Sequence, residues 1–414
     1  MAFQQGLSGL NSSSKAIDVV SNNIANANTV GFKASTAQFA DVYASSLTGT
    51  VASIQIGIGS SVNAVRQAFS QGNLTSTNSP LDMAINGNGF FEVALRDGTF
   101  ALTRNGQFDI DADGYIVTAL GDRLMGYQET DPLTGDVRAP ANPTNANYQA
   151  LFIPPTGIRA RATDDVTIGA NLSAQADVIA VSPPVLTDAS TYSYTTAIRV
   201  YDSLGVDHSL SLYFVKSAPQ TWDVYTSVDG SAPANPPLGT LGFASDGTLS
   251  SGSLQNLAGI DFGNGSAIFN TEIDFSRMTQ FGSGSVVKEL SQNGYSDGEI
   301  AGLSISKNGV IQGRYTNGQT QDIGIVGLVT VRSPNGMSSL GNNLWRDTPE
   351  SGEPVRGPAG EGLNGVISAG MVEDSNVDLT QELVQLIIQQ RNYQANAQSI
   401  RTQDQILQTL VNLR

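Results

Sequence analysis

Few side chains in this sequence are suited to catalysis or metal binding. The chain contains one histidine, His208, and no cysteine. Of the histidine and cysteine side chains that nucleophile–base pairs and the usual zinc sites need, the chain therefore offers a single imidazole. That histidine lies in YDSLGVDHSL, at a strand edge or turn, where a structural role is the more frequent one. The sequence predicts no enzyme, no catalytic residue and no cofactor.

One acidic pattern, DIDADGYIVTAL, resembles a metal-binding loop. Asp109, Asp111, Asp113 and Gly114 match positions 1, 3, 5 and 6 of an EF-hand, but Leu120 stands where the bidentate Glu belongs. The flanks alternate as strands do, so a β-turn on Asp113-Gly114 explains the pattern better. We therefore predict a turn and no metal site, with a weak calcium site left open.

The composition limits the class of protein and its partners. A formal charge of −16 over 414 residues argues against binding the phosphate backbone of nucleic acids. Charged residues make up 14% of the chain, against roughly 25% in typical domains, which suits extracellular and self-associating proteins. No stretch is apolar enough to insert into a membrane. The N-terminus lacks the features of a cleaved signal peptide, which leaves a cytoplasmic location or export without cleavage.

Turn signals separate a β-rich middle from two different ends. Asn-Gly and Asp-Gly dipeptides, which favour tight hairpins, occur from Asn86-Gly87 to Asn364-Gly365 and nowhere outside. Between them lie short alternating runs such as GFFEVAL, TTAIRVYD and LSLYFVK. We predict a mixed, mainly β fold with terminal α-helices that form a coiled-coil-like inner domain.

Composition changes predict that one β-rich domain is inserted in another. The Pro-rich passage at 131–156 and the FGSGS stretch at 281–285 are the expected crossings. The predicted division is a terminal helical and connecting polymerisation domain (1–70 plus 366–414), a β-rich middle domain (71–144 plus 285–365) and an inserted outer β domain (145–284).

Both ends of the chain follow a helical period. Apolar residues recur at steps of four and three near the N-terminus, with two serines among them. The C-terminal segment does the same without Gly or Pro, and Asp378 is the expected N-cap, with Glu382 in the first turn. The apolar stripes comprise Phe3, Leu7, Leu10, Ile17 and Ile24, and Leu379, Leu383, Leu386, Tyr393, Ile400, Leu407 and Val411.

The opposite faces of these helices are rich in Gln, Asn, Ser and Thr and carry few charges, which suggests packing against copies or lining a wet channel. Ordering about 80 residues costs about 1 to 2 kcal/mol each, whereas each buried large apolar side chain returns about 1.5 to 3 kcal/mol. An isolated helix pair is therefore marginal, and we expect ends that are mobile in the monomer and ordered in a polymer. Pairing into one intramolecular coiled coil stays open.

Three stretches together resemble the bacterial flagellar rod and hook proteins. GLSGLNSSSKAIDVVSNNIANANTVGFKAS (6–35) is similar to their N-terminal signature, and SAGMVEDSNVDLTQELVQLIIQQRNYQANAQSIRTQDQILQTLVNL (368–413) to their C-terminal one. INGNGFFEV and LTRNGQFDIDADGYIVTALGDRLMGY resemble the first β segment of the family. The length, with IRVYDSLGVDHSLSLYFVK and TWDVYTSVDG, resembles the hook members rather than the shorter rod members.

This resemblance implies a structural role outside the cell. The implied product is a flexible, hollow helical homopolymer in the flagellar hook that links rod to filament as a universal joint. The implied partners are the rod, hook cap and hook–filament junction proteins, and the type III export apparatus, which leaves no cleaved signal peptide. A distal rod or hook-associated protein, or a secreted β-rich adhesin or enzyme, remains as an alternative.

The resemblance gives the terminal residues expected roles. The apolar stripes would join copies of the chain, with Phe32 as a packing anchor or ordinary local core. The asparagines of SNNIANAN would give the first helix a neutral polar face toward the channel or neighbours. Asn28-Thr29 and Gly31 would end that helix, because Gly tolerates the left-handed conformation common at helix ends.

Overall fold

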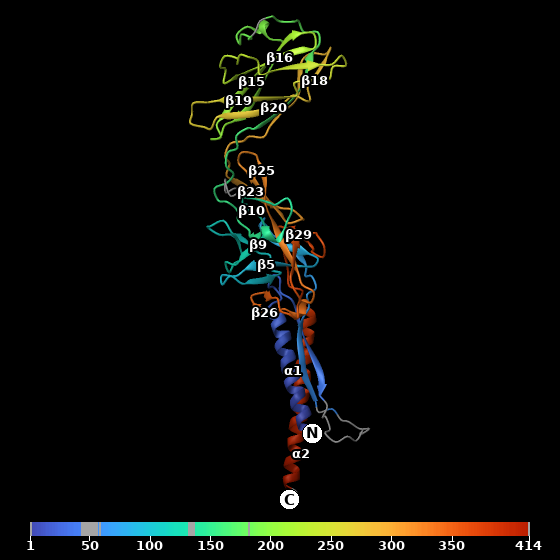
Figure 1. Cartoon of the computed structure of the whole chain (residues 1–414). Coiled ribbons are helices and arrows are strands. Elements are labelled where there is room, and N and C mark those ends of the chain that lie inside the picture. Colours follow the sequence, from blue (N-terminus) through green and yellow to red (C-terminus); the bar gives the residue numbers. More distant parts are fainter. Residues whose placement is uncertain (1, 43–56, 58, 131–136, 181–182, 413–414) are drawn as a thin grey trace. The chain divides into compact units, whose positions relative to one another are not determined.

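A computed structural model describes residues 2–42, 57, 59–130, 137–180 and 183–412 of the chain. The fold is mainly β, with one long helix at each end, α1 (Ala2–Ala25) and α2 (Leu379–Asn412) (Figure 1). The mainly β fold with terminal helices is therefore confirmed. In the described part of the chain, neither helix is long and apolar enough to cross a membrane.

The two helices begin and end for local reasons. Asp378 is the N-cap of α2, since its Oδ1 accepts hydrogen bonds from the amides of Thr380 at 2.9 Å and Gln381 at 3.1 Å. Helix α1 ends at Ala25, earlier than predicted. The turn at Gly31 lies further along the chain, and its φ of +71° together with the backbone of residues 104–105 leaves no room for a Cβ.

Short antiparallel pairs join the N-terminal third of the chain to its C-terminal end. The strands β3 (Leu74–Ser76) and β4 (Met83–Asn86) pair with β30 (Met371–Glu373) and β29 (Val366–Ala369), respectively. A separate hairpin, β1 (Ser35–Val42) with β2 (Gly59–Gln67), follows α1. The β3–β30 and β4–β29 pairings therefore hold the segment that follows α1 beside the segment that precedes α2.

The largest sheet carries the β core near the helices. Phe90, Leu102, Val329, Val331 and Trp345 form one buried cluster, against which Phe69 and Met337 pack. The path of this sheet is β23 (Ile300–Ile305), β24 (Val310–Tyr315), β25 (Thr320–Thr330), β9 (Arg123–Tyr127), β5 (Phe90–Ala94), β6 (Phe100–Thr103), β27 (Leu344–Arg346) and β26 (Ser338–Gly341). Also attached are β7 (Asp109–Ile110), β8 (Ile116–Val117), β12 (Tyr148–Ala150) and β28 (Val355–Pro358), while β10 (Glu129–Thr130) pairs with β11 (Val137–Arg138).

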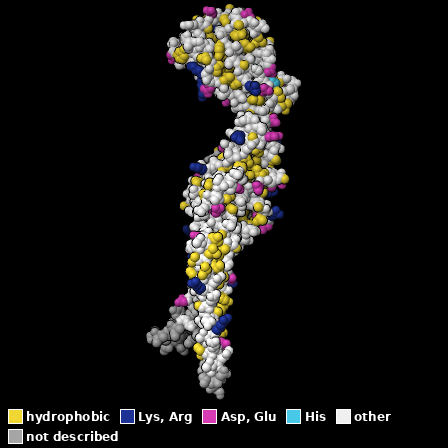
Figure 2. Space-filling view, turned by 180° about the vertical axis from the view of Figure 1, so that it is seen from behind, with side chains coloured by type: hydrophobic (Ala, Val, Ile, Leu, Met, Phe, Trp, Pro, Cys, Tyr) yellow, Lys and Arg dark blue, Asp and Glu magenta, His cyan; other side chains and the backbone are white. Residues whose placement is uncertain are grey.

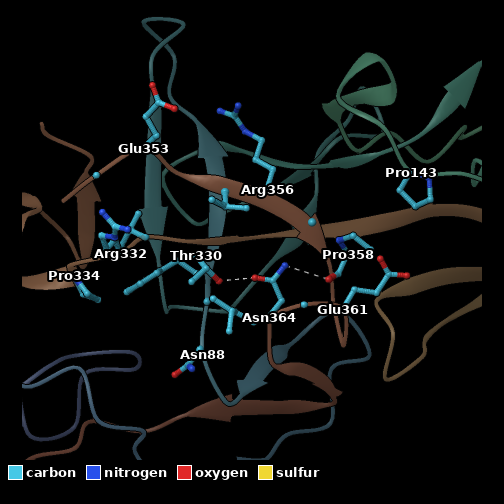
Figure 3. A pocket seen from close by; sticks show the side chains of 18 of the residues that line it. Asn88, Pro143, Thr330, Arg332, Pro334, Glu353, Arg356, Pro358, Glu361 and Asn364 are labelled. Atoms are coloured by element: carbon cyan, nitrogen blue, oxygen red, sulfur yellow. Dashed lines mark hydrogen bonds between the residues drawn. The ribbon is translucent and has the colours of Figure 1, made fainter.

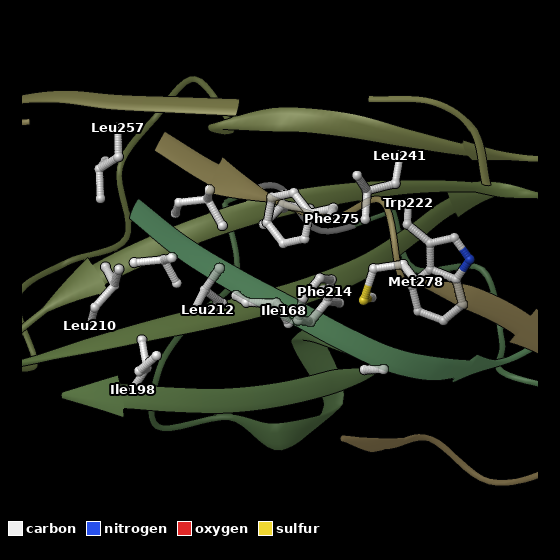
Figure 4. Packing of buried hydrophobic residues seen from close by; sticks show 14 of the residues in the cluster. Ile168, Ile198, Leu210, Leu212, Phe214, Trp222, Leu241, Leu257, Phe275 and Met278 are labelled. Carbon is white, nitrogen blue, oxygen red and sulfur yellow. The ribbon is translucent and has the colours of Figure 1, made fainter. Parts of the chain in front are cut away.

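A second β core lies between two other sheets (Figure 4). Large buried side chains from both sheets, including Ile168, Phe214, Trp222, Leu241 and Phe275, pack into one cluster. The first sheet contains β13 (Asp165–Ser173), β19 (Leu254–Ile260), β20 (Phe269–Asp274), β21 (Thr279–Phe281) and β22 (Val286–Gln292). The second contains β14 (Tyr194–Tyr201), β15 (Asp207–Ala218), β16 (Thr221–Val228), β17 (Gly239–Phe243) and β18 (Leu249–Ser251).

Compactness divides the chain into two units. Unit 1 comprises Met1–Pro154, Leu303–Gly313 and Gln321–Arg414, and unit 2 comprises Pro155–Gly302 and Arg314–Thr320. The terminal helices and the first β core thus belong to one unit. The predicted three-part division, with boundaries near residues 145 and 284, stays a prediction.

Candidate assembly surface on the terminal helices

Helices α1 and α2 pack against each other in antiparallel orientation. A Cβ built on Gly6 would lie 2.9 Å from Cγ1 of Ile400, and one on Gly9 would lie 2.9 Å from the side chain of Asn396. At the other end of α1, Asn23 donates to Oε1 of Glu382 at 3.1 Å. Early residues of one helix therefore meet late residues of the other. Small residues of α1 let the two helices approach closely, so the intramolecular pairing that the sequence left open is present.

A third element, the β1–β2 hairpin, also packs on α1. Ser12 Oγ donates to the carbonyl of Ser60 at 3.2 Å, and the Ser60 amide donates to Ser8 Oγ at 3.3 Å. Gln5 donates to the carbonyl of Gly57 at 2.6 Å. Because the hydroxyl of Ser12 has hydrogen-bond partners in the hairpin, this polar side chain can be buried.

The predicted stripes are only partly covered by these intramolecular contacts. Their exposed members are 37% to 51% accessible. The other stripe residues are half-buried, apart from Val411, whose side chain lies outside the described residues. Phe32, the predicted packing anchor, is buried. The exposed group is Phe3, Leu7, Leu379, Leu383, Tyr393 and Leu407, and the half-buried group is Leu10, Ile17, Ile24, Leu386 and Ile400.

Sequence reasoning missed four further exposed apolar residues of α2. Val384, Ile387, Ile388 and Ile406 are 43% to 52% accessible. The signal was the VQLIIQQ run, in which two of these isoleucines stand side by side and so broaden the apolar face beyond one heptad stripe. Apolar side chains are visible at the surface of the helical part of unit 1 (Figure 2). We call the exposed apolar residues of α1 and α2 the uncovered helix surface.

A buried charge cluster connects the terminal segments to the β core. Lys33 Nζ lies 2.6 Å from Oε1 of Glu373, and Arg104 lies 3.1 Å from Oε2 of the same carboxylate. Lys33 also donates to the carbonyl of Ser70, and the amide of Gly72 donates to Glu373, both at 2.8 Å. One carboxylate therefore joins four segments that are far apart in the sequence.

Burial dominates the electrostatics of this cluster. The side chains of Lys33 and Glu373 are fully buried, and that of Arg104 is 5% exposed. Burial lowers the pKa of Lys33 and of Arg104, while the charge and hydrogen bonds of Glu373 act in the opposite direction. Glu373 is therefore the group that makes two buried cations tolerable.

Two asparagines fix the register of the same region. Asn23 is buried and pairs with the backbone of Ser35 through both its Nδ2 and its Oδ1, at 2.8 and 2.9 Å. Asn376 accepts from the amide of Ala34 at 2.7 Å and donates to the carbonyl of Ala68 at 2.7 Å. Asn23 thus closes the turn between α1 and β1, which differs from the channel- or neighbour-facing role that the sequence suggested for the asparagines of SNNIANAN; Asn22 and Asn28 of that stretch are exposed.

The acidic loop predicted as a turn has the hydrogen bonds of one. Oδ1 of Asp111 accepts from the amides of Asp113 at 3.0 Å and Tyr115 at 2.7 Å, and Gly114 has a φ of +93°. Over the described ranges, no group of three or more His, Cys, Asp or Glu side chains is arranged to hold a metal ion.

A cavity of about 1240 Å³ opens in unit 1 beside the first β core (Figure 3). Arg356 lines it and makes two 2.7 Å hydrogen bonds to the buried carboxylate of Glu92, which raises the pKa of Arg356. Thr330, Asn364 and the carbonyl of Pro358 are linked by hydrogen bonds on another wall. The chain's only histidine belongs to unit 2, so the cavity contains no imidazole base.

Family models match the chain in four places. The flagella basal body rod protein model matches residues 3–33, and the flagellar hook protein FlgE/F/G D1 domain model matches 84–171. The flagellar basal body protein FlaE D2 domain model matches 171–295, and the flagellar basal body rod FlgEFG protein C-terminal model matches 368–413. These matches cover both terminal helices, the second β core and the part of the first β core that contains Phe90 and Leu102.

Full-length relatives are similar throughout. The flagellar hook protein FlgE of Escherichia coli is 39% identical over 421 residues, and that of Borreliella burgdorferi is 32% identical over 451 residues, each with 100% of this chain covered and at least 99% of the relative. The crystal structure of Helicobacter pylori flagellar hook protein FlgE2 has a TM-score of 0.52 at 17% identity, covering 72% of this chain and 99% of that one, which supports the fold. The chain therefore belongs to the flagellar hook protein family, a family of structural proteins.

Proposed function

We propose that the chain builds the flagellar hook by self-assembly through the uncovered helix surface. The observation that carries the proposal is that different residues of the helices make the intramolecular contact and form the exposed surface. Small residues such as Gly6 and Gly9 lie where α1 packs on α2, whereas large apolar residues such as Leu383 and Leu407 stay exposed. Exposed apolar patches of this kind are typical of protein–protein contact sites.

The energetics favour burial of this surface between copies. Each large apolar side chain that is removed from water contributes about 1.5 to 3 kcal/mol. The uncovered helix surface includes Leu379, Leu383, Val384, Ile387 and Ile388 within three turns of α2. Packing between copies would therefore add free energy to the α1–α2 pairing, and we expect the ends to be better ordered in the polymer than in the single chain.

The charge cluster around Glu373 has a positioning role in this proposal. It lies between the helices and the β core of unit 1, and it joins the segment after α1 to the segment before α2. Copies can stack in register only if every chain presents its helices in the same way. A buried ionic cluster suits that purpose, because charges that need specific partners disfavour alternative packings.

The wider proposal follows from the resemblance and the family. The product would be a hollow, flexible extracellular tube that links rod to filament and transmits torque, with the helices inside and β domains outside. The chain would be exported by the type III apparatus and would meet rod, hook cap and junction proteins. Within the tube, the division into residues 1–70 plus 366–414, 71–144 plus 285–365, and 145–284 would separate tight inner packing from polar, adjustable outer contacts.

Substitutions on the exposed positions test this proposal. Leu383→Asp and Leu407→Asp place a charge on the uncovered helix surface, and Leu363→Asp is the matched control, since Leu363 is 77% exposed on the β part of unit 1. Purified chains are concentrated with a kosmotropic salt and examined by electron microscopy and sedimentation. We expect tubes from the wild type and from Leu363→Asp and none from the helix variants. Normal tubes from both helix variants would overturn the proposal.

A further inference from the structure

At an Asn-Gly pair, the protein backbone can react with its own side chain. The glycine nitrogen gives up its proton to hydroxide and attacks Cγ of the asparagine, and the side-chain amide leaves as ammonia after taking a proton from water. Water then adds to the succinimide ring, whose opening gives aspartate or isoaspartate and one more negative charge. Glycine favours the ring closure because it has no Cβ. In this chain such pairs occur from Asn86-Gly87 to Asn364-Gly365.

Hydrogen bonds hold most of these pairs in an unreactive arrangement. The side chain of Asn364 donates to the carbonyl of Pro358 and accepts from Thr330 (Figure 3). The amide of Gly365 donates to the carbonyl of Asn88 at 2.7 Å. Hydrogen bonds also engage the asparagine side chain, the glycine amide or both in the pairs that begin at Asn86, Asn105, Asn264, Asn293, Asn308, Asn317 and Asn335.

The pair Asn88-Gly89 differs from all of these. Among the residues that the structure describes, no hydrogen bond engages the side chain of Asn88 or the amide of Gly89. Asn88 is exposed, and Figure 3 shows its side chain without the dashed bonds that hold Asn364. A Cβ built on Gly89 would lie 3.7 Å from the nearest atoms of other residues, so the surroundings are not tight. Both residues line the cavity of unit 1, which gives water access to them.

We propose that Asn88-Gly89 is a site of spontaneous deamidation, which places a carboxylate on the wall of the cavity in unit 1. At this pair no hydrogen bond has to open before the glycine nitrogen attacks. Elsewhere, the need to open one hydrogen bond of average strength slows the reaction by about fivefold. Because the attacking nitrogen must first lose its proton, the reaction is faster at higher pH. The proposal depends on the fold of unit 1 and not on assembly.

The two products act differently on the fold. Aspartate leaves the main chain unchanged, so the contact from the Gly365 amide to the residue 88 carbonyl persists. Isoaspartate lengthens the main chain by one atom between residues 88 and 89, and the former carbonyl becomes a free carboxylate beside the chain. The neighbouring residues Asn86 and Val366 are paired at the end of the β4–β29 ladder. Isoaspartate at residue 88 therefore loosens that end of the ladder.

Peptide mass spectrometry tests the site directly. The full-length chain, kept dilute and monomeric, is incubated at pH 6 and at pH 8 and then digested with pepsin at low pH, which stops the reaction. We expect Asn88 to be converted at least about fivefold faster than Asn317 or Asn364, and faster at pH 8 than at pH 6. Equal rates at Asn88 and at the two hydrogen-bonded asparagines would overturn the proposal.

The unfolded chain is the matched reference for these rates. In guanidinium chloride the three pairs have the same two residues and no folded contacts, so their rates should become similar. If Asn88 remains the fastest there by the same factor, the fold does not set the rate and the proposal fails. In Asn88→Gln, whose longer side chain closes a ring less readily, the product at residue 88 should disappear.

Hydrogen exchange separates the two products. Protection of the segment at 364–367 should fall in aged wild-type chains that contain isoaspartate. It should persist in Asn88→Asp, which carries the added charge on a normal main chain. Unchanged protection in chains that mass spectrometry shows to carry isoaspartate at residue 88 would contradict the expected loosening.

Discussion

Replacing Glu373 by Gln tests the buried charge cluster most sharply. The change keeps the shape of the side chain but leaves Lys33 and Arg104 buried without an anionic partner. Removing one partner of a buried ion pair costs about 3 to 5 kcal/mol, because the remaining charge is uncompensated. Two cations share this carboxylate, and it also accepts from the Gly72 amide at 2.8 Å. We therefore expect the free energy of unfolding of unit 1 to fall by about 3 to 5 kcal/mol.

The assay combines urea denaturation with hydrogen exchange resolved by peptide. In Glu373→Gln, protection should fall for the four segments that the carboxylate joins, around residues 31–34, 70–74, 103–105 and 371–376. It should stay unchanged in the core strands β15 and β16 of unit 2. Glu353→Gln is the control, since Glu353 is exposed. If the free energy of unfolding falls by less than about 1 kcal/mol, which is typical for the loss of a surface ion pair, the reasoning is refuted.

Three further predictions concern other parts of the chain. Phe214→Ala empties a fully buried position in the core of unit 2 and should cost about 3 to 5 kcal/mol, measured by the fluorescence of the buried Trp222, while exchange in α1 and α2 stays as in the wild type. Gly31→Ala should cost more than about 1 kcal/mol in denaturant unfolding, because its φ is positive and the new Cβ would lie 2.6 Å from the Asn105 nitrogen; an unchanged midpoint would contradict this. The pKa values of Asp202 and Asp229 are lowered in the folded chain, so their ionised carboxylates stabilise unit 2 when the pH is above the ordinary aspartate pKa of 3.8. Unit 2 should therefore lose stability as pH falls below about 4. In Asp202→Asn, the thermal unfolding temperature should depend less on pH in this acidic range.

Local features of the fold could be predicted from the sequence. Asp378 combines an N-cap residue type with a following Gly- and Pro-free helical pattern, and it caps α2 as expected. Asp113-Gly114 carries its own turn geometry, because Gly supplies the positive φ that the turn needs. Such features depend on neighbours in the chain, which a single sequence shows.

The features that the sequence did not reveal depend on distant partners. Glu373 meets Arg104 across 269 positions and Lys33 across 340, and no local pattern indicates that one carboxylate serves both. The role of Asn23 depends on how the chain turns back from α1 into β1. The close approach at Gly6 and Gly9 was missed because the heptad pattern draws attention to large apolar residues rather than to small ones.

Cryo-electron microscopy of the assembled polymer tests the central claim most directly. In a map that resolves side chains, Leu383, Ile387 and Leu407, each exposed in the single chain, are expected to be buried against helices of neighbouring copies. The α1–α2 pairing at Gly6 and Ile400 should persist within each chain. If these three side chains instead remain open to solvent, and copies contact one another only through their β-sheets, the terminal helices do not drive assembly.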